Sequence, residues 1–201
     1  MSKTYGDNPP LSYNKYLRVP DLINLQDCLS DPAHHDELLF ITVHQAYELW
    51  FKQILHELDA AITLLAEDRL PAATRAVKRV VEIEKLLVSQ IHILESMTPL
   101  SFLQFRDELN PASGFQSMQF REIEFSSGLK DESILAEFSE DRFAYERLKE
   151  RSSKPSLADA FYSALERRGF NAPAIGSGNS TESQAHYGKA NSGGTGNTHS
   201  L

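Results

Sequence analysis

Apolar residues recur at helical spacing through most of the first 170 positions of the chain. One apolar stripe covers residues 36–67 without an internal glycine or proline, which predicts a single long helix. A second stripe begins at Leu70-Pro71 and stops at Thr98-Pro99, where proline can open one helix and end another. Because only a few residues separate the two stripes, we expect two long helices packed antiparallel.

Shorter helical pieces are predicted on both sides of this pair. One opens at Pro20 and carries Leu22, Leu25 and Leu29. The others cover residues 100–109, 116–125, 132–152 and 156–168, with turns at 31–32 and 110–114 and with caps at Gly128, Ser156 and Gly169. Alternating apolar and polar runs are too short to predict a strand, so the predicted fold class is all-α.

The composition changes after Phe170. Six of the ten glycines lie between Gly176 and Gly196, mixed with serine, asparagine and threonine, and large apolar residues almost vanish. Such a segment buries too little apolar surface to offset the entropy lost on ordering. We therefore predict a flexible lead over residues 1–12, a helical domain over 13–170 and a disordered tail over 171–201.

Charge and cysteine content narrow the class of protein. The 28 acidic and 20 basic residues give a net charge of −8, which disfavours nucleic acid and anionic membranes as partners. The one cysteine, Cys28, cannot form an internal disulfide, and its apolar neighbours predict a core position. The first ten residues lack the pattern of a secretory signal, and no apolar run is long enough to cross a membrane. We expect a cytoplasmic protein.

The segment from Phe40 to Phe51 is the strongest candidate for chemistry. Phe40, His44, Tyr47 and Phe51 recur at spacings that place them on one helical face. A titratable ring walled by aromatic side chains suits a flat apolar ligand with one polar atom. The same pattern also suits a hydrogen-bonded histidine in an ordinary core.

Three other features could contribute to a site. Phe102 and Arg106 stand four residues apart, and the guanidinium could bind a carboxylate or pair with a neighbouring acid. The segment 112–117 enters a predicted helix and offers hydroxyl and backbone donors to an anion. Tyr13 and Tyr16 could anchor the N-terminal arm or reach into another protomer.

Several longer motifs occur in order along residues 13–170: Tyr13-Asn14-Lys15-Tyr16-Leu17, His35-Asp36-Glu37-Leu38-Leu39-Phe40, His44-Gln45, Glu48-Leu49-Trp50, Glu95-Ser96-Met97-Thr98-Pro99, Phe105-Arg106-Asp107, Ser113-Gly114-Phe115-Gln116-Ser117 and Gln119-Phe120-Arg121. Together they resemble the tryptophan 2,3-dioxygenase family. The resemblance implies an oxidoreductase that uses haem b and O₂ to open the indole ring of L-tryptophan. The product would be N-formyl-L-kynurenine, in the kynurenine pathway of tryptophan catabolism.

The resemblance also implies a role for each candidate residue. His44 would be the catalytic distal histidine that hydrogen-bonds the indole nitrogen, and Arg106 would pair with the substrate carboxylate. The substrate site would be completed by Phe40, Ile41, Thr42, Val43 and Phe102, with Ser113 near the haem. Tyr13 and Tyr16 would reach into a neighbouring subunit of a homotetramer.

Two family features are matched only faintly. They are the proximal histidine that ligates the iron and a glycine-threonine loop, for which His186 and Thr195 are the candidates. The proximal ligand and any metal site are therefore not identified from the sequence. The alternative hypothesis is a truncated, haem-less, non-catalytic helical module that oligomerises with full-length subunits.

Overall fold

The computed structural model of the chain describes residues 10–170, which form helices and connecting loops without a strand. The all-α prediction is confirmed for these residues. The chain divides into two compact units, residues 1–164 and 165–201, and all features that follow belong to the first except the end of α8 and Gly169. The predicted lead is described only from Pro10 onward, and the predicted tail at residues 171–201 lies outside the described part.

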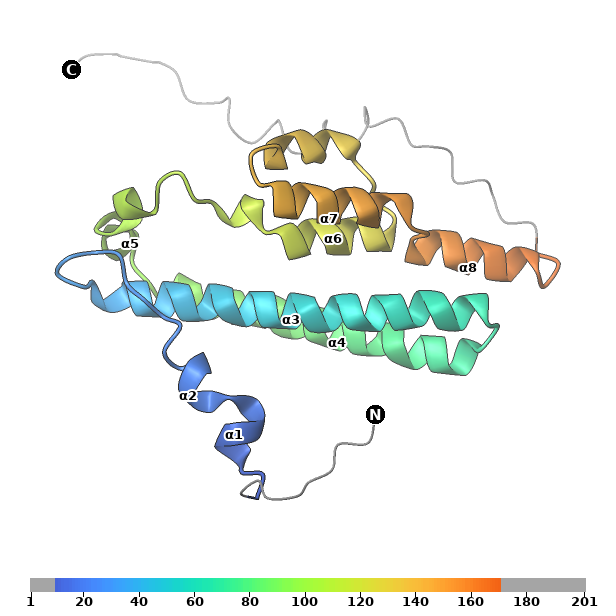
Figure 1. Ribbon diagram of the computed structural model, residues 1–201, viewed down its shortest axis with the longest axis horizontal. Coiled ribbons are helices and arrows are strands. Elements are labelled where there is room, and N and C mark those ends of the chain that lie inside the picture. Colours follow the sequence, from blue (N-terminus) through green and yellow to red (C-terminus); the bar gives the residue numbers. More distant parts are fainter. Residues whose placement is uncertain (1–9, 171–201) are drawn as a thin grey trace, which may run out of the picture. The chain divides into compact units, whose positions relative to one another are not determined.

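The two long helices form an antiparallel pair, as predicted (Figure 1). They are α3 (His35–Ala66) and α4 (Leu70–Glu95), and the short turn between them places Asp68 in the left-handed region at φ 56°. Aspartate tolerates this region better than most residues. The core between the helices is made by Ile54, Leu58, Val80, Ile83 and Leu87.

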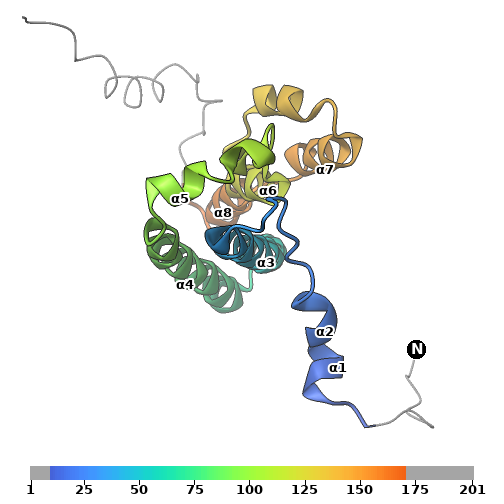
Figure 2. The ribbon, with the colours of Figure 1, turned by 90° about the vertical axis from the view of Figure 1, so that its left-hand side faces the viewer.

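A second layer covers α3 on the side of α6 (Met118–Ser127), as Figure 2 shows end-on. Helix α7 (Arg142–Ser153) packs in turn on α6. Phe125 and Leu148 have no exposed surface and form the centre of this second core, with Phe138 and Ala144 beside them. Among residues 10–170 no helix is both long and apolar enough to cross a membrane.

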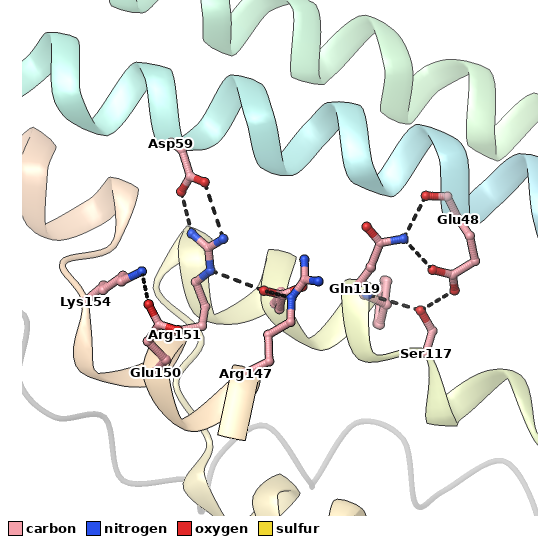
Figure 3. Close-up of polar contacts among 10 residues, drawn as sticks. Glu48, Asp59, Ser117, Gln119, Arg147, Glu150, Arg151 and Lys154 are labelled. Carbon is pink, nitrogen blue, oxygen red and sulfur yellow. Dashed lines mark hydrogen bonds and ion pairs between the residues drawn. The ribbon is translucent and has the colours of Figure 1, made fainter. Parts of the chain in front are cut away.

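Ion pairs join the two layers (Figure 3). Arg151 on α7 contacts Asp59 on α3, and its Nε lies 3.6 Å from the Glu122 carboxylate on α6. Arg147 Nε donates to the same carboxylate at 2.9 Å. Burial alone lowers the pKa of Arg151, but the two acidic partners raise it above its ordinary value, so the guanidinium stays charged.

Helix α8 (Leu157–Glu166) begins and ends near the predicted caps. The Ser156 hydroxyl accepts from Asp159 N at 3.1 Å, which is an N-cap, and Gly169 has a φ of 81°. Gly128 closes α6 at φ 124°, and a Cβ there would lie 3.1 Å from the Ala158 side chain. Glycine therefore relieves both backbone strain and crowding at this turn.

The predicted helix over residues 100–109 is wrong as a single element. The chain forms α5 (Pro99–Leu103) and then a separate 3₁₀ helix, η1 (Arg106–Leu109). Phe105 lies between these two helices with φ −124° and ψ −5°, and its side chain is completely buried. Burial of this ring fixes a backbone geometry that is incompatible with one continuous helix.

Other predicted boundaries also move. The 132–152 piece divides into η3 (Glu132–Phe138) and α7, because the Asp141 side chain caps α7 by accepting from Ala144 N at 3.0 Å. The 116–125 piece becomes η2 (Gly114–Gln116) followed by α6, which Ser117 caps.

The predicted helix near Pro20 is shorter than expected. After α1 (Tyr13–Leu17), helix α2 (Val19–Leu22) ends where the Asn24 amide donates to Pro20 O at 2.6 Å. Side-chain donors that bind helix carbonyls in this way compete with the next helical turn. Cys28 follows in the extended segment and is half-buried, so the predicted core position is wrong.

Candidate active site

The first half of α3 presents one face to a cavity of about 530 Å³. Phe40, His44, Tyr47 and Phe51 all line it, in agreement with the face predicted from their spacing. Glu48 of α3 also lines it. The other walls come from α4 and from the stretch between the end of η1 and the start of α6, through Ile91, Leu94, Leu109, Ala112, Ser113, Gly114, Gln116 and Ser117. The volume lies within the range of about 300–1,000 Å³ that is usual for small-molecule sites.

The hydrogen bonding of His44 places a proton on one of its two ring nitrogens. Nδ1 lies 2.7 Å from the Phe40 carbonyl oxygen. A carbonyl oxygen can only accept, so Nδ1 carries a proton, and the neutral tautomer that fits this bond has Nε2 as an acceptor. No hydrogen bond within residues 10–170 engages Nε2. His44 can therefore accept a hydrogen bond from a ligand N–H in the cavity.

An aromatic cluster surrounds Phe40 at the start of this face. The Phe40 ring centroid lies 4.1 Å from that of His44 and 5.7 Å from those of both Phe102 and Phe105. Phe102 and Phe105 meet edge-on, with centroids 5.5 Å apart. Their contacts hold α5 and its following residues against the start of α3 and fix the ring of Phe40.

Arg106 lies directly beyond this cluster. Its guanidinium carbon is 5.8 Å from the centroid of the Phe102 ring, within the range of a cation–π contact. The side chain is exposed, and within the described part of the chain it forms no ion pair, including none with Asp107. Arg106 does not line the cavity, but its charge is free for an anion beside Phe102.

The segment that carries Ser113 is built from its own hydrogen bonds. Ser113 N donates to Gln116 Oε1 at 3.0 Å, and the Ser113 hydroxyl accepts from Phe115 N at 3.3 Å. This reciprocal arrangement is a capping box. It places Ser113 in the wall of the same cavity as His44, which the sequence alone could not establish.

The remaining predicted substrate residues do not line this cavity. Val43 is buried with 4% of its surface exposed, Ile41 is half-buried and Thr42 is exposed. Tyr13 and Tyr16 project from α1 with 75% and 70% of their surfaces exposed. The two tyrosines therefore do not line the cavity of their own chain.

Comparison with known proteins decides the family. A family model described as tryptophan 2,3-dioxygenase matches residues 3–178. This chain belongs to the tryptophan 2,3-dioxygenase family. The curated tryptophan 2,3-dioxygenase of Nocardioides sp. is 53% identical over 165 residues, which are 80% of this chain and 62% of that relative. That of Herpetosiphon aurantiacus is 48% identical over 163 residues, 81% of this chain and 62% of the relative.

The chain spans about six-tenths of the length of these curated tryptophan 2,3-dioxygenases. Two of the residues predicted from the family, His186 and Thr195, lie outside the described residues. Within residues 10–170 no group of three histidine, cysteine, aspartate or glutamate side chains is arranged to hold a metal ion. His44 provides the one imidazole in the cavity lining found among these residues.

Sequence reasoning about the tryptophan 2,3-dioxygenase motifs missed the role of Glu37. This carboxylate is fully buried and accepts from Leu29 N at 2.6 Å, from Ser30 N at 3.1 Å and from the Ser30 hydroxyl. Burial alone raises the pKa of Glu37, but these hydrogen bonds and nearby His34 lower it below its ordinary value. Glu37 therefore holds Leu29 and Ser30, in the segment before α3, against the first turn of α3.

The lowered pKa of Glu37 predicts a pH dependence of stability. The unfolded chain binds this proton more tightly than the folded chain, so the contribution is complete above the ordinary value of 4.5 and is lost as the pH falls below it. Glu37→Gln should lower stability at pH 7 and give a shallower loss of stability below pH 4.5. Urea midpoints measured from pH 7 to pH 3 test this. Glu84→Gln, at an exposed site on α4, should follow the unaltered chain.

Proposed function

We propose that this chain takes part in tryptophan 2,3-dioxygenase chemistry, the haem-dependent addition of both atoms of O₂ across the indole C2–C3 bond of L-tryptophan to give N-formyl-L-kynurenine. The observation that carries the proposal is the free Nε2 acceptor of His44 in a cavity walled by aromatic side chains. The indole of tryptophan is a flat apolar ring with a single N–H donor, which matches this acceptor.

Each described residue has a defined task in this proposal. Phe40 packs against the indole, and His44 accepts the hydrogen bond of the indole N–H and so orients the ring. Arg106 binds the substrate carboxylate through paired hydrogen bonds beside Phe102. Orientation of this kind lowers the barrier because the reacting atoms are held in place before reaction.

The family implies haem b, and the cavity lining is compatible with its apolar body. Phe51, Ile91, Leu94 and Leu109 offer apolar contacts, and Ser113 lies in the same wall. When bound, the haem iron would supply the activation of O₂. The proximal ligand is not identified, and His186 is only a candidate from the sequence. We propose a homotetramer in which exposed Tyr13 and Tyr16 contact a neighbouring subunit.

The test is reconstitution of the 201-residue chain. The purified chain is mixed with haemin and reduced, and its Soret spectrum is recorded with and without L-tryptophan. A stable haem complex, a tryptophan-dependent spectral change and formation of N-formyl-L-kynurenine are expected. Absence of a haem complex would contradict the proposal, and self-association without haem would favour the alternative of a haem-less oligomerising module.

A substitution at His44 tests its contact with the indole. His44→Ala removes one neutral hydrogen bond, so kcat/KM for L-tryptophan should fall about five- to tenfold. The same variant should lose the preference for L-tryptophan over its N1-methyl analogue, which has no N–H to donate. His56→Ala, at an exposed site on the same helix, is the control and should keep both properties. An unfolded His44→Ala chain would instead indicate a core histidine.

A further inference from the structure

Glu48, which follows His44 by one helical turn in the sequence, is the centre of a polar cluster with Ser117 and Gln119 (Figure 3). The Glu48 carboxylate accepts from the Ser117 hydroxyl at 2.6 Å and from Gln119 Nε2 at 2.7 Å. Gln119 Nε2 also donates to the backbone carbonyl of Glu48 at 2.8 Å. Glu48 is half-buried, and both of its carboxylate oxygens are occupied by donors from the entry to α6.

The segment that Glu48 holds has a second, longer bond to α6, in which Arg121 Nη2 donates to Phe115 O at 3.4 Å. Residues 112–117 form part of the cavity wall, yet Phe115, their one large apolar side chain, is 77% exposed. The segment therefore has no apolar anchor of its own, and polar contacts must fix its position. Ser117 connects it to α6 because its hydroxyl, while donating to Glu48, accepts from Phe120 N at 3.2 Å.

We propose that Glu48 is a positioning residue for the substrate site: through Ser117 and Gln119 it holds the 112–117 segment, with Ser113, against the His44 face of α3. The inference rests on the proposed function for its catalytic consequence. Glu48 acts as an acceptor at two places: its carboxylate accepts from Ser117 and Gln119, and its backbone carbonyl accepts from Gln119. Loss of these contacts leaves the cavity wall free to move away from the substrate.

The first measurement uses hydrogen exchange of the ligand-free chain. Ser117→Asp and Ser117→Asn have nearly the same shape, and either side chain can cap α6. Only asparagine can donate to Glu48, whereas aspartate places a second negative charge beside it. Ser117→Asp should raise amide exchange in residues 113–117 by about ten- to hundredfold, and Ser117→Asn should retain most of the protection. Ser163→Asp, at an exposed site on α8, is the control for the added charge and should leave this exchange unchanged.

The second measurement uses the reconstituted enzyme. Ser117→Asp and Glu48→Gln should raise KM for L-tryptophan by about tenfold with a smaller change in kcat, because the wall is misplaced while the reacting groups remain. Equal loop exchange in Ser117→Asp and Ser117→Asn would overturn the inference, and so would a raised exchange with unchanged KM. If the unaltered chain bound no haem, the proposed function would fail, while the exchange experiment would still decide whether Glu48 holds the segment.

Discussion

Replacing Phe105 by alanine is expected to lower the free energy of unfolding by about 3–5 kcal/mol. The Phe105 ring is completely buried and contacts the rings of Phe40, Phe102 and His34. Its removal forfeits the transfer of a large apolar side chain from water and leaves a cavity that these neighbours fill only partly. Single domains have a total stability of about 5–15 kcal/mol, so this variant would be close to unfolding.

Urea unfolding followed by circular dichroism at 222 nm measures this loss, because the described residues are mainly helical. The control is Phe115→Ala, which removes the same ring from a site that is 77% exposed. The control should change stability by no more than about 0.5 kcal/mol. Similar losses in both variants would mean that the ring cluster around Phe105 does not stabilise the folded chain.

Phe105 also illustrates why the short elements were difficult to predict. The long helices α3 and α4 each contain many turns, so their apolar period and their end signals are unambiguous in the sequence. Around Phe105 the chain makes about one turn of α5 and one of η1, which is too little for a period to appear. The break depends on burial of one ring against α3, a tertiary contact that local spacing does not encode.

The candidate site likewise has one part that the sequence predicts and another part that only the fold reveals. The face shared by Phe40, His44, Tyr47 and Phe51 follows from helical spacing alone. Glu48 meets Ser117 and Gln119 from positions 69 and 71 residues away, and Glu37 meets Ser30 across a loop. Side-chain partners of this kind are chosen by the approach of separate elements. The sequence signals were polar residues at the entry to a predicted helix, which are too common to identify a partner.

Arg106→Gln should have the largest effect on substrate recognition. Hydrogen bonds to a charged group contribute about 1.5–3 kcal/mol each, so loss of the two proposed for the guanidinium should raise KM for L-tryptophan by about 100-fold or more. Arg106→Lys should have a KM between those of the unaltered chain and Arg106→Gln, because an ammonium keeps the charge but lacks the planar pair of donors. Arg75→Gln, at an exposed site toward the opposite end of the helical pair, is the matched control and should keep the original KM.

Tryptamine separates recognition of the carboxylate from support of the aromatic cluster, because it has the indole and the amine of tryptophan without the carboxylate. If Arg106 binds the carboxylate, Arg106→Gln should lose activity on L-tryptophan but have the same activity on tryptamine as the unaltered chain. If Arg106 acts instead by packing over Phe102, from which its guanidinium is 5.8 Å away, both substrates should be affected equally. Equal losses would therefore remove Arg106 from substrate binding and assign it to the aromatic cluster that fixes Phe40.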